Sequence, residues 1–507
     1  MRISYLLQRI EASVRREPPI AEGGFPLKKL LAVLGILVAL LVLAGVAILV
    51  LVDVNAHKPR IESAVSDALG MEFRIQGKAR LRLFPSAGIA LSDVRLRNRG
   101  TDLATAETLR VGVKLRPLLD RRIVITELAI EKPVIRIEKG SDGKFNYETP
   151  PRPAKPAAQE GEAPSGPLVV SAGSVSAGKI VYADRKAKSE ASLDAIDLSV
   201  RDLSIPTAQG VELSKGISFS GDLSVGEMKS KDLAVSDVRA KVTAAAGVYE
   251  IRPFTMKLFG GAGEGGIRVD LSGEKTALKV NYTLAKFRAE DPLAALAQKK
   301  YLSGPMTVTP DLSLRGKNAD EMMRTLSGTV SLRGDGLTLH GMGIDEILSK
   351  AEEAQKLNLA DVGAFLLAGP LGSAAVKGYR YGGLYRSATR EGETRITRLV
   401  SDWTVRDGMA DARDVAFSTG KNRIALKGKL DLVNGRFVDV TVAVLDEKGC
   451  AKIRQKISGP FGDPRMDKTS VLQSFAEPIL GLFERGRELI GRSSCEPFYT
   501  GTVQHPK

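Results

Sequence analysis

The segment that decides the fold is Leu109–Arg116, whose sequence LRVGVKLR alternates apolar side chains with basic residues and one glycine. The same period of two runs through Val438–Val444, which reads VDVTVAV. Successive side chains of a strand point to opposite faces of its sheet, so this alternation predicts strands with one apolar and one polar face. Such asymmetry is typical of antiparallel sheets. Asn434 and Gly435 precede the second segment and favour a hairpin turn.

Outward from these two segments, alternation dominates the chain after residue 53. Shorter runs are Leu81 and Leu83; Ile135 and Ile137; Ile267, Val269 and Leu271; and Leu278, Val280 and Tyr282. Helical spacing occurs in Asn55–Leu69, Gly343–Leu367 and Ser470–Ile490. The sequence therefore predicts a mainly β protein, with an elongated, curled antiparallel sheet and a few covering helices.

A long sheet with one apolar face must bury that face against something. The apolar face could line a groove for acyl chains, which need burial without specific polar partners. It could equally form the dry core of a conventional sandwich, and the alternation alone does not decide between the two. The candidate groove residues are Leu109, Val111, Val113, Leu115, Ile135, Ile137, Ile267, Val269, Leu271, Val438, Val440 and Val442.

A membrane anchor is predicted near the N-terminus. The uncharged stretch 30–52 is rich in Leu, Val and Ala and is long enough to cross a hydrocarbon core of ~30 Å as a helix. A cleaved signal peptide has an apolar region of only ~7–15 residues, so we interpret the stretch as an uncleaved transmembrane helix rather than a buried core helix. Basic residues within 1–29 predict a cytoplasmic tail, which places the rest of the chain across the membrane.

The chain after the anchor divides at a linker. Residues 149–167 are rich in Pro and Ala and lack bulky apolar side chains, which predicts an extended spacer. We therefore expect a first β region at 53–148 and a longer one at 168–507. At ~4.8 Å per strand, on the order of 25 stacked strands would reach roughly 120 Å.

Composition excludes several classes of function. Three His and two Cys in 507 residues are too few for several transition-metal sites, so neither a metal nor another cofactor is expected. The net charge of +15 could attract anionic headgroups or could be spread over solvated strand faces. Nucleic acid is disfavoured because no basic segment is interleaved with stacking aromatics.

No motif supports an enzyme. Gly261–Gly266 matches the spacing G-x-G-x-x-G, but a strand pattern follows it where a dinucleotide site needs a helix N-terminus. We interpret this segment as a glycine-rich turn. No phosphate-binding loop, H-E-x-x-H pair or G-x-S-x-G elbow occurs, and no pair of carboxylates stands out as an acid and its base.

Cys450 and Cys495 are the only two cysteines and both follow the predicted anchor. An even count in an oxidising compartment predicts a disulfide, with free thiols as the alternative. Such a bond would fasten the C-terminal end of the chain to the sheet.

The ordered series of segments resembles the AsmA-like family of Gram-negative envelope proteins. In the first region the resemblance rests on Pro59-Arg60-Ile61, Gly70, Phe84-Pro85, Ile89–Asn98 (IALSDVRLRN), Leu109–Leu119 (LRVGVKLRPLL) and Gly143–Asn146 (GKFN). In the later region it rests on Leu326–Thr329 (LSGT), Gly334–Leu337 (GDGL), Leu359–Gly372 (LADVGAFLLAGPLG), Trp403–Val405 and Gly408–Ala410. Met71, which follows Gly70, departs from the family pattern, and so does the linker.

The resemblance implies a protein anchored in the inner membrane, with a periplasmic β-rich groove similar to that of bridge-like lipid transfer proteins. Its partners would be phospholipid, the inner membrane and, in addition, outer-membrane or other envelope proteins. The implied function is lipid transport between the inner and outer membranes. The alternative is a structural or regulatory factor in outer-membrane protein assembly, without lipid transfer. Both are analogies at the level of fold.

Overall fold

The structure is a computed structural model of the chain. It describes residues 54–82, 87–114, 124–148, 168–206, 212–230, 233–297, 301–349, 392–461, 463–467, 470–471 and 495–507. The predicted tail, the transmembrane helix and the linker lie outside these residues, as does Leu115. No helix within the described ranges is long and apolar enough to cross a membrane.

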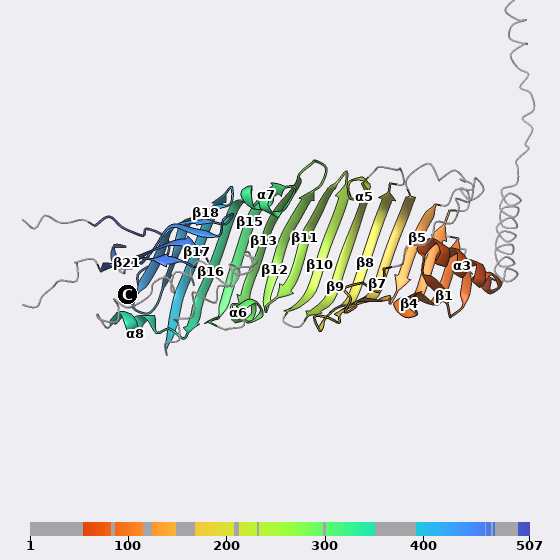
Figure 1. The fold of residues 1–507 in the computed structure, drawn as a ribbon, viewed down its shortest axis with the longest axis horizontal. Coiled ribbons are helices and arrows are strands. Elements are labelled where there is room, and N and C mark those ends of the chain that lie inside the picture. Colours follow the sequence, from red (N-terminus) through yellow and green to blue (C-terminus); the bar gives the residue numbers. More distant parts are fainter. Residues whose placement is uncertain are drawn as a thin grey trace, which may run out of the picture.

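Strands make up most of the described chain (Figure 1). The first strands are β1 (Glu72–Ile75), β2 (Ala79–Arg82), β3 (Gly88–Asn98), β4 (Thr101–Val113), β5 (Ile125–Glu131), β6 (Val134–Lys139), β7 (Leu168–Asp184) and β8 (Ser189–Ile205). Next come β9 (Ser218–Ser230), β10 (Leu233–Ala245), β11 (Val248–Leu258), β12 (Gly261–Asp270), β13 (Thr276–Arg288), β14 (Leu302–Ser303), β15 (Pro305–Gly316) and β16 (Ser327–His340). The last are β17 (Glu393–Arg406), β18 (Met409–Ser418), β19 (Arg423–Asp431), β20 (Arg436–Leu445), β21 (Ala451–Pro460), β22 (Arg465–Met466) and β23 (Ser470–Val471).

Helices are short and lie between or before the strands. They are η1 (Val54–His57), α3 (Lys58–Leu69), α5 (Leu213–Gly216), α6 (Glu290–Ala297), α7 (Ala319–Arg324) and α8 (Ile344–Ser349). The expected helix at Asn55–Leu69 is confirmed by η1 and α3. Of the expected helix at Gly343–Leu367, α8 forms the first part, and residues 350–367 lie outside the described ranges. The expected helix at Ser470–Ile490 is wrong at its start, because Ser470 and Val471 pair with β21 as β23.

The 23 strands of the described chain form one sheet, in which most strands pair with their neighbours in chain order. In the exceptions, β1 and β2 both pair with β3, β4 pairs with both β5 and β6, and β13 pairs with β15. The pairings are antiparallel except that β7 runs parallel to both β5 and β6. This corrects the expectation of a purely antiparallel sheet. A parallel pair needs a crossover, which the chain between β6 and β7 provides. The sheet is therefore continuous across the predicted linker, and its contour is on the order of 90 Å at ~4.8 Å per strand.

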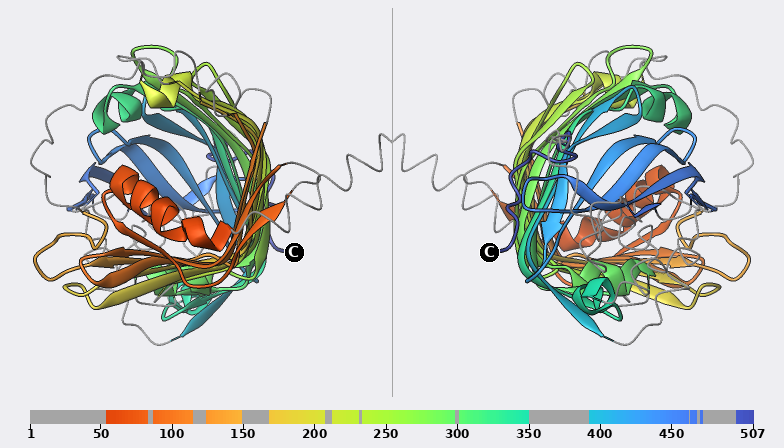
Figure 2. Two further views of the ribbon diagram at one scale, coloured as in Figure 1. Left: turned by 90° about the vertical axis from the view of Figure 1, so that its right-hand side faces the viewer. Right: turned by 90° about the vertical axis from the view of Figure 1, so that its left-hand side faces the viewer.

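The strands curl around the long axis of the sheet, so that its backbone follows an open curve in the end-on views of Figure 2. The bend coincides with residues of positive φ inside the strands, such as Asp93 (φ 49°), Ala195 (φ 54°), Asp237 (φ 52°) and Lys286 (φ 55°). A left-handed residue breaks the alternation, so that side chains three positions apart face the same way. At Lys286, for example, Leu284 and Phe287 both enter one apolar cluster. Irregularities of this kind bend strands and increase their twist.

The largest core lies at the C-terminal end of the sheet. Its buried side chains come from β13 to β21 and from α8, and include Phe417, Ile424, Val440 and Val442. A smaller core beneath α3 contains Phe73 and other residues of β1 to β4. Both ends of the sheet therefore have an apolar core. The hairpin predicted at Asn434–Gly435 is confirmed and joins β19 to β20 in the C-terminal part.

The C-terminal segment 495–507 lies over the outer face of this end. Cys450 and Cys495 lie at disulfide distance, with Cα atoms 6.1 Å apart, and are bonded as predicted. Tyr499 and Val503 are buried against Val400 and Ala443 in a third, small cluster. The bond therefore fastens a segment that covers apolar residues on the outer side of the sheet.

The predicted turn at Gly261–Gly266 is wrong, because these residues form the first half of β12. Glycine is needed there by the neighbouring strand rather than by a turn. A Cβ atom on Gly263 would lie 2.2 Å from the hydroxyl oxygen of Tyr282, and one on Gly265 would lie 2.2 Å from the carbonyl oxygen of Asn281. Glycine within a strand commonly marks such a close approach.

Candidate functional site

A single row of side chains runs along the inner face of the sheet, in the direction in which the strands stack. Residues directly opposite each other on neighbouring strands point to the same face. The pairing register links Val111, Leu128, Gly173, Val200, Gly221, Val242, Ile251, Ile267, Val280, Leu312, Gly328, Val405, Ala410, Leu430 and Phe437. Every member of this set, which we name the inner row, is apolar or glycine. The inner row is therefore apolar without interruption from β4 to β20.

Burial changes along the inner row. From Val111 on β4 to Leu312 on β15, every side chain larger than glycine is only half-buried. From Val405 on β17 onward, all members are buried, with at most 8% of each residue exposed. The same apolar face is thus an open groove along β4 to β15 and a packed core beyond it. The open part has a length on the order of 40 Å at ~4.8 Å per strand.

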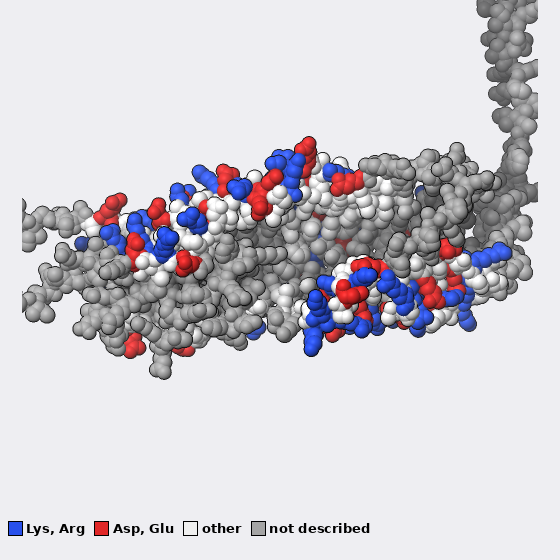
Figure 3. Space-filling view, viewed as in Figure 1, with Lys and Arg blue, Asp and Glu red and all other residues white. Residues whose placement is uncertain are grey.

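The outer face and the margins of the groove are charged. Residues adjacent in sequence to the inner row point to the outer face. Among them, Arg268 of β12 forms a cross-strand ion pair with Glu250 of β11. Arg201 and Asp222 form another, with 2.9 Å between nitrogen and oxygen. Figure 3 shows charged side chains along the upper margin at left and centre and along the lower margin at right, with uncharged described surface between them near the centre. The groove is therefore amphipathic in cross-section, with a hydrocarbon-like floor and polar edges.

A pocket of about 550 Å³ lies in the middle of the open part. Its lining includes Val175, Leu198, Leu223 and Ala240, which are consecutive cross-strand partners on β7 to β10. They form a second inward-facing row beside the inner row. The lining therefore offers dispersion contacts to an apolar ligand, and polar residues such as Asp197 and Arg239 also border the pocket.

Three of the predicted groove residues lie in the two rows just described. Val111 and Ile267 belong to the inner row. Leu109 pairs with Ile130, which in turn pairs with Val175 of the pocket. Of the remaining residues in the first two regions, Val113 ends β4, Val269 lies in β12 and Leu271 comes just after it, and Ile135 and Ile137 lie in β6.

The predicted groove residues of β20 do not line the open groove. Val440 and Val442 face inward, but both are fully buried in the C-terminal core and line no open groove. Val438 does not share their face, because Asp439 has φ 49° and the register shifts between Lys427 and Lys429. Val438 therefore pairs with Lys429 on the outer side. A bulge cannot be recognised from alternation, since the residues around Asp439 still read as apolar and polar in turn.

Sequence reasoning missed an aromatic contact on the groove floor. Phe254 of β11 and Tyr282 of β13 lie on either side of Gly265, with ring centroids 5.6 Å apart. The Tyr282 hydroxyl oxygen is buried without a hydrogen-bond partner. Burial raises the pKa of Tyr282, so the phenol stays neutral. The alternation of glycine with Ala262 and Glu264 was the available signal that a neighbouring ring crosses this strand.

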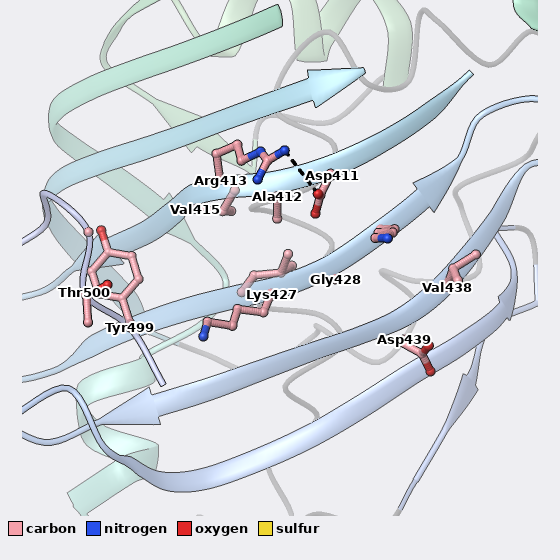
Figure 4. A pocket seen from close by; sticks show the side chains of 13 residues that line it. Asp411, Ala412, Arg413, Val415, Lys427, Gly428, Val438, Asp439, Tyr499 and Thr500 are labelled. Atoms are coloured by element: carbon pink, nitrogen blue, oxygen red, sulfur yellow. Dashed lines mark ion pairs between the residues drawn. The ribbon is translucent and has the colours of Figure 1, made fainter. Parts of the chain in front are cut away.

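A second pocket, of about 530 Å³, lies on the outer face between β18 to β20 and the C-terminal segment (Figure 4). Its lining mixes charges of both signs, including Asp411 and Arg413, whose carboxylate and guanidinium lie 3.5 Å apart. Tyr499 borders the pocket and donates its hydroxyl hydrogen to Asp414. Burial, and then this hydrogen bond, raise the pKa of Tyr499. The pocket is a polar hollow beside the fastened C-terminal segment and is separate from the groove.

One cluster has the hydrogen-bond order of a hydrolytic triad. His340 Nε2 lies 2.8 Å from Ser303 Oγ, and its Nδ1 lies 2.8 Å from a carboxylate oxygen of Glu393. The side chains of His340 and Glu393 are 38% and 66% exposed, so water screens the group. The adjacent Gly304 N–H, which could serve as an oxyanion donor, is bonded to Glu290 at 3.1 Å. We interpret the cluster as a polar ladder across β14, β16 and β17.

Among the residues that the structure describes, no group of three or more His, Cys, Asp or Glu side chains could hold a metal ion. The apolar groove along β4 to β15 is the candidate functional site.

Comparison with known proteins agrees with this architecture. The AsmA family profile matches residues 26–225 and, a second time, residues 215–415. The chain belongs to the AsmA family. No curated protein and no solved structure matches it. In this AsmA-family protein the first match ends in β9 and the second begins just before it, so the two repeats meet in the open part of the groove rather than at the linker.

Proposed function

We propose that this AsmA-family protein is anchored in the inner membrane and binds the acyl chains of phospholipid in its periplasmic groove. In this role it assists lipid transport between the inner and outer membranes. The observation that carries the proposal is the inner row, which is uninterrupted in its apolar character and yet only half-buried from Val111 to Leu312. A monomeric protein rarely leaves so large an apolar surface open without a ligand or partner for it.

The chemistry of the groove suits a lipid tail. Each CH2 group of an acyl chain that leaves water contributes about 0.8 kcal/mol, and it requires no hydrogen-bond partner. The polar margins would keep a headgroup in water while the tail lies on the floor. No step of this function needs a catalytic group, and we propose no enzymatic activity.

The proposal is tested by photo-crosslinking in the full chain, in its native membranes. p-Benzoylphenylalanine is placed at Val269, which is half-buried on the groove floor, or at the adjacent Arg268, which is exposed on the outer face. We expect a lipid adduct at Val269, identified by mass spectrometry of the purified protein, and none at Arg268.

The two positions are adjacent in one strand and lie on opposite faces, so a difference in lipid labelling reports which face the lipid contacts. Equal labelling at both positions, or no lipid at either, would contradict lipid binding in the groove. Crosslinks to protein at Arg268, with no lipid at Val269, would instead support the assembly factor that acts without lipid transfer.

A further inference from the structure

The N-terminal end of the groove is covered by α3. Ile61 and Val65 of this helix pack against the cluster that contains Leu91 and Val94, and Leu109 of the groove face packs against the same cluster. In the end-on view of Figure 2, α3 lies inside the outline of the curled sheet. The helix therefore occupies apolar surface that is continuous with the open floor of the groove.

Polar bonds to the edge of the sheet hold α3 in place. The Phe73 N–H donates to Ser66 Oγ at 2.8 Å, and the Ile75 N–H donates to Glu62 Oε1 at 2.7 Å. Both donors belong to β1, which pairs with β3 on its other side only. Exposed edges of this kind are normally protected by a covering element. The helix thus supplies acceptors to an edge strand that would otherwise be open to solvent.

The apolar side chains of α3 are only partly buried against the sheet. No residue of the helix is buried, and Leu69 at its C-terminal end is 52% exposed. Gly70 follows in a left-handed conformation with φ 71°, which ends the helix and separates it from β1. If α3 left the sheet, water could bond to the freed N–H groups. The buried side chains of β1 to β4 beneath the helix would then need another apolar cover, which an acyl chain on the groove floor would provide.

We propose that α3 is a displaceable stopper that controls the passage of acyl chains between the membrane and the groove. The inference rests on the proposed lipid-binding function and names its regulation. The predicted membrane helix ends at residue 52, and α3 begins at Lys58, so the stopper lies where a lipid from that membrane would first meet the groove. An entering acyl chain takes the positions of Ile61 and Val65 on the groove floor.

The test compares two double variants of the full chain, reconstituted in vesicles that contain a fluorescent phospholipid. Glu62→Ala with Ser66→Ala removes the acceptors that hold α3 to β1. Asp67→Ala with Ser63→Ala, the control, makes the same kind of change on the exposed side of the same helix. Alanine favours the helix, so neither variant melts it. We expect the loosened variant to transfer lipid to acceptor vesicles about tenfold faster than wild type, and the control to match wild type.

A second measurement, hydrogen exchange of the Phe73 and Ile75 amides, reports docking of α3 without reference to lipid. Faster exchange and faster transfer in the loosened variant alone support the stopper. Unchanged transfer while lipid is bound, or equal acceleration in the control, overturns the stopper and leaves lipid binding intact. Absence of bound lipid and of transfer in all three proteins overturns the proposed function, and the stopper with it.

Discussion

Two equivalent substitutions on the inner face should lower the free energy of unfolding by very different amounts. Val440→Ala removes two methyl groups from a fully buried position in the C-terminal core. At about 0.8 kcal/mol per buried group, with an added cavity term, the expected loss is about 2–3 kcal/mol of unfolding free energy. Val269→Ala makes the same deletion at a half-buried position on the open floor. Less apolar area is lost and no enclosed cavity forms, so the cost should stay below about 1 kcal/mol.

The assay uses Trp403, the single tryptophan of the chain, which lies in the same core as Val440. Its fluorescence during urea denaturation reports unfolding of this part of the sheet. With a slope of about 2–3 kcal/mol per M urea, Val440→Ala should lower the midpoint by about 1 M. Val269→Ala should barely move it, because strands in a linear array depend mainly on their neighbours. Equal shifts for the two variants would refute the division into an open groove and a packed core.

Three further predictions concern other parts of the molecule. Replacing Cys450 and Cys495 by serine should cost about 4 kcal/mol, the chain-entropy value for a loop of 45 residues, measured by the same Trp fluorescence. Gly265→Ala should destabilise by about 1–3 kcal/mol, seen in thermal unfolding, because the new Cβ meets backbone on β13. The hydrogen bond from Arg110 lowers the pKa of Glu131, so its stabilising effect is present at neutral pH and lost as pH falls through that lowered pKa. In the Arg110→Gln variant, acidification should therefore cause a smaller loss of amide protection in β4 and β5 than it does in wild type.

Each of these has its own control. The reduced wild-type protein should behave like the double serine variant, and a difference between them would assign the effect to the serines. Gly273→Ala, whose Cβ would approach no atom closer than 3.8 Å, should be nearly neutral, and an equal loss there would contradict the contact argument. An acid profile of the Arg110 variant that matches wild type would show that the ion pair with Glu131 does not stabilise the fold.

Sequence reasoning succeeded where the signal was local. Alternation at Leu109–Val113 and Ile267–Leu271 was enough to identify strands and their apolar face, because the side-chain period of a strand is a property of the backbone itself. It failed at Val438, where one residue of positive φ, Asp439, moves the preceding side chain to the other face. It also failed at Gly261–Gly266, because the need for glycine arises from Tyr282 on the neighbouring strand.

The sequence by itself determined that the chain is mainly β, that one face of its strands is apolar and that its two cysteines can pair. Only the tertiary structure decided that Val269 lies on an open floor and Val440 in a dry core, although both read as the same alternation. The reason is physical. Alternation records which side chains prefer to leave water, whereas burial depends on which distant element, such as α3 or β21, comes back to cover them.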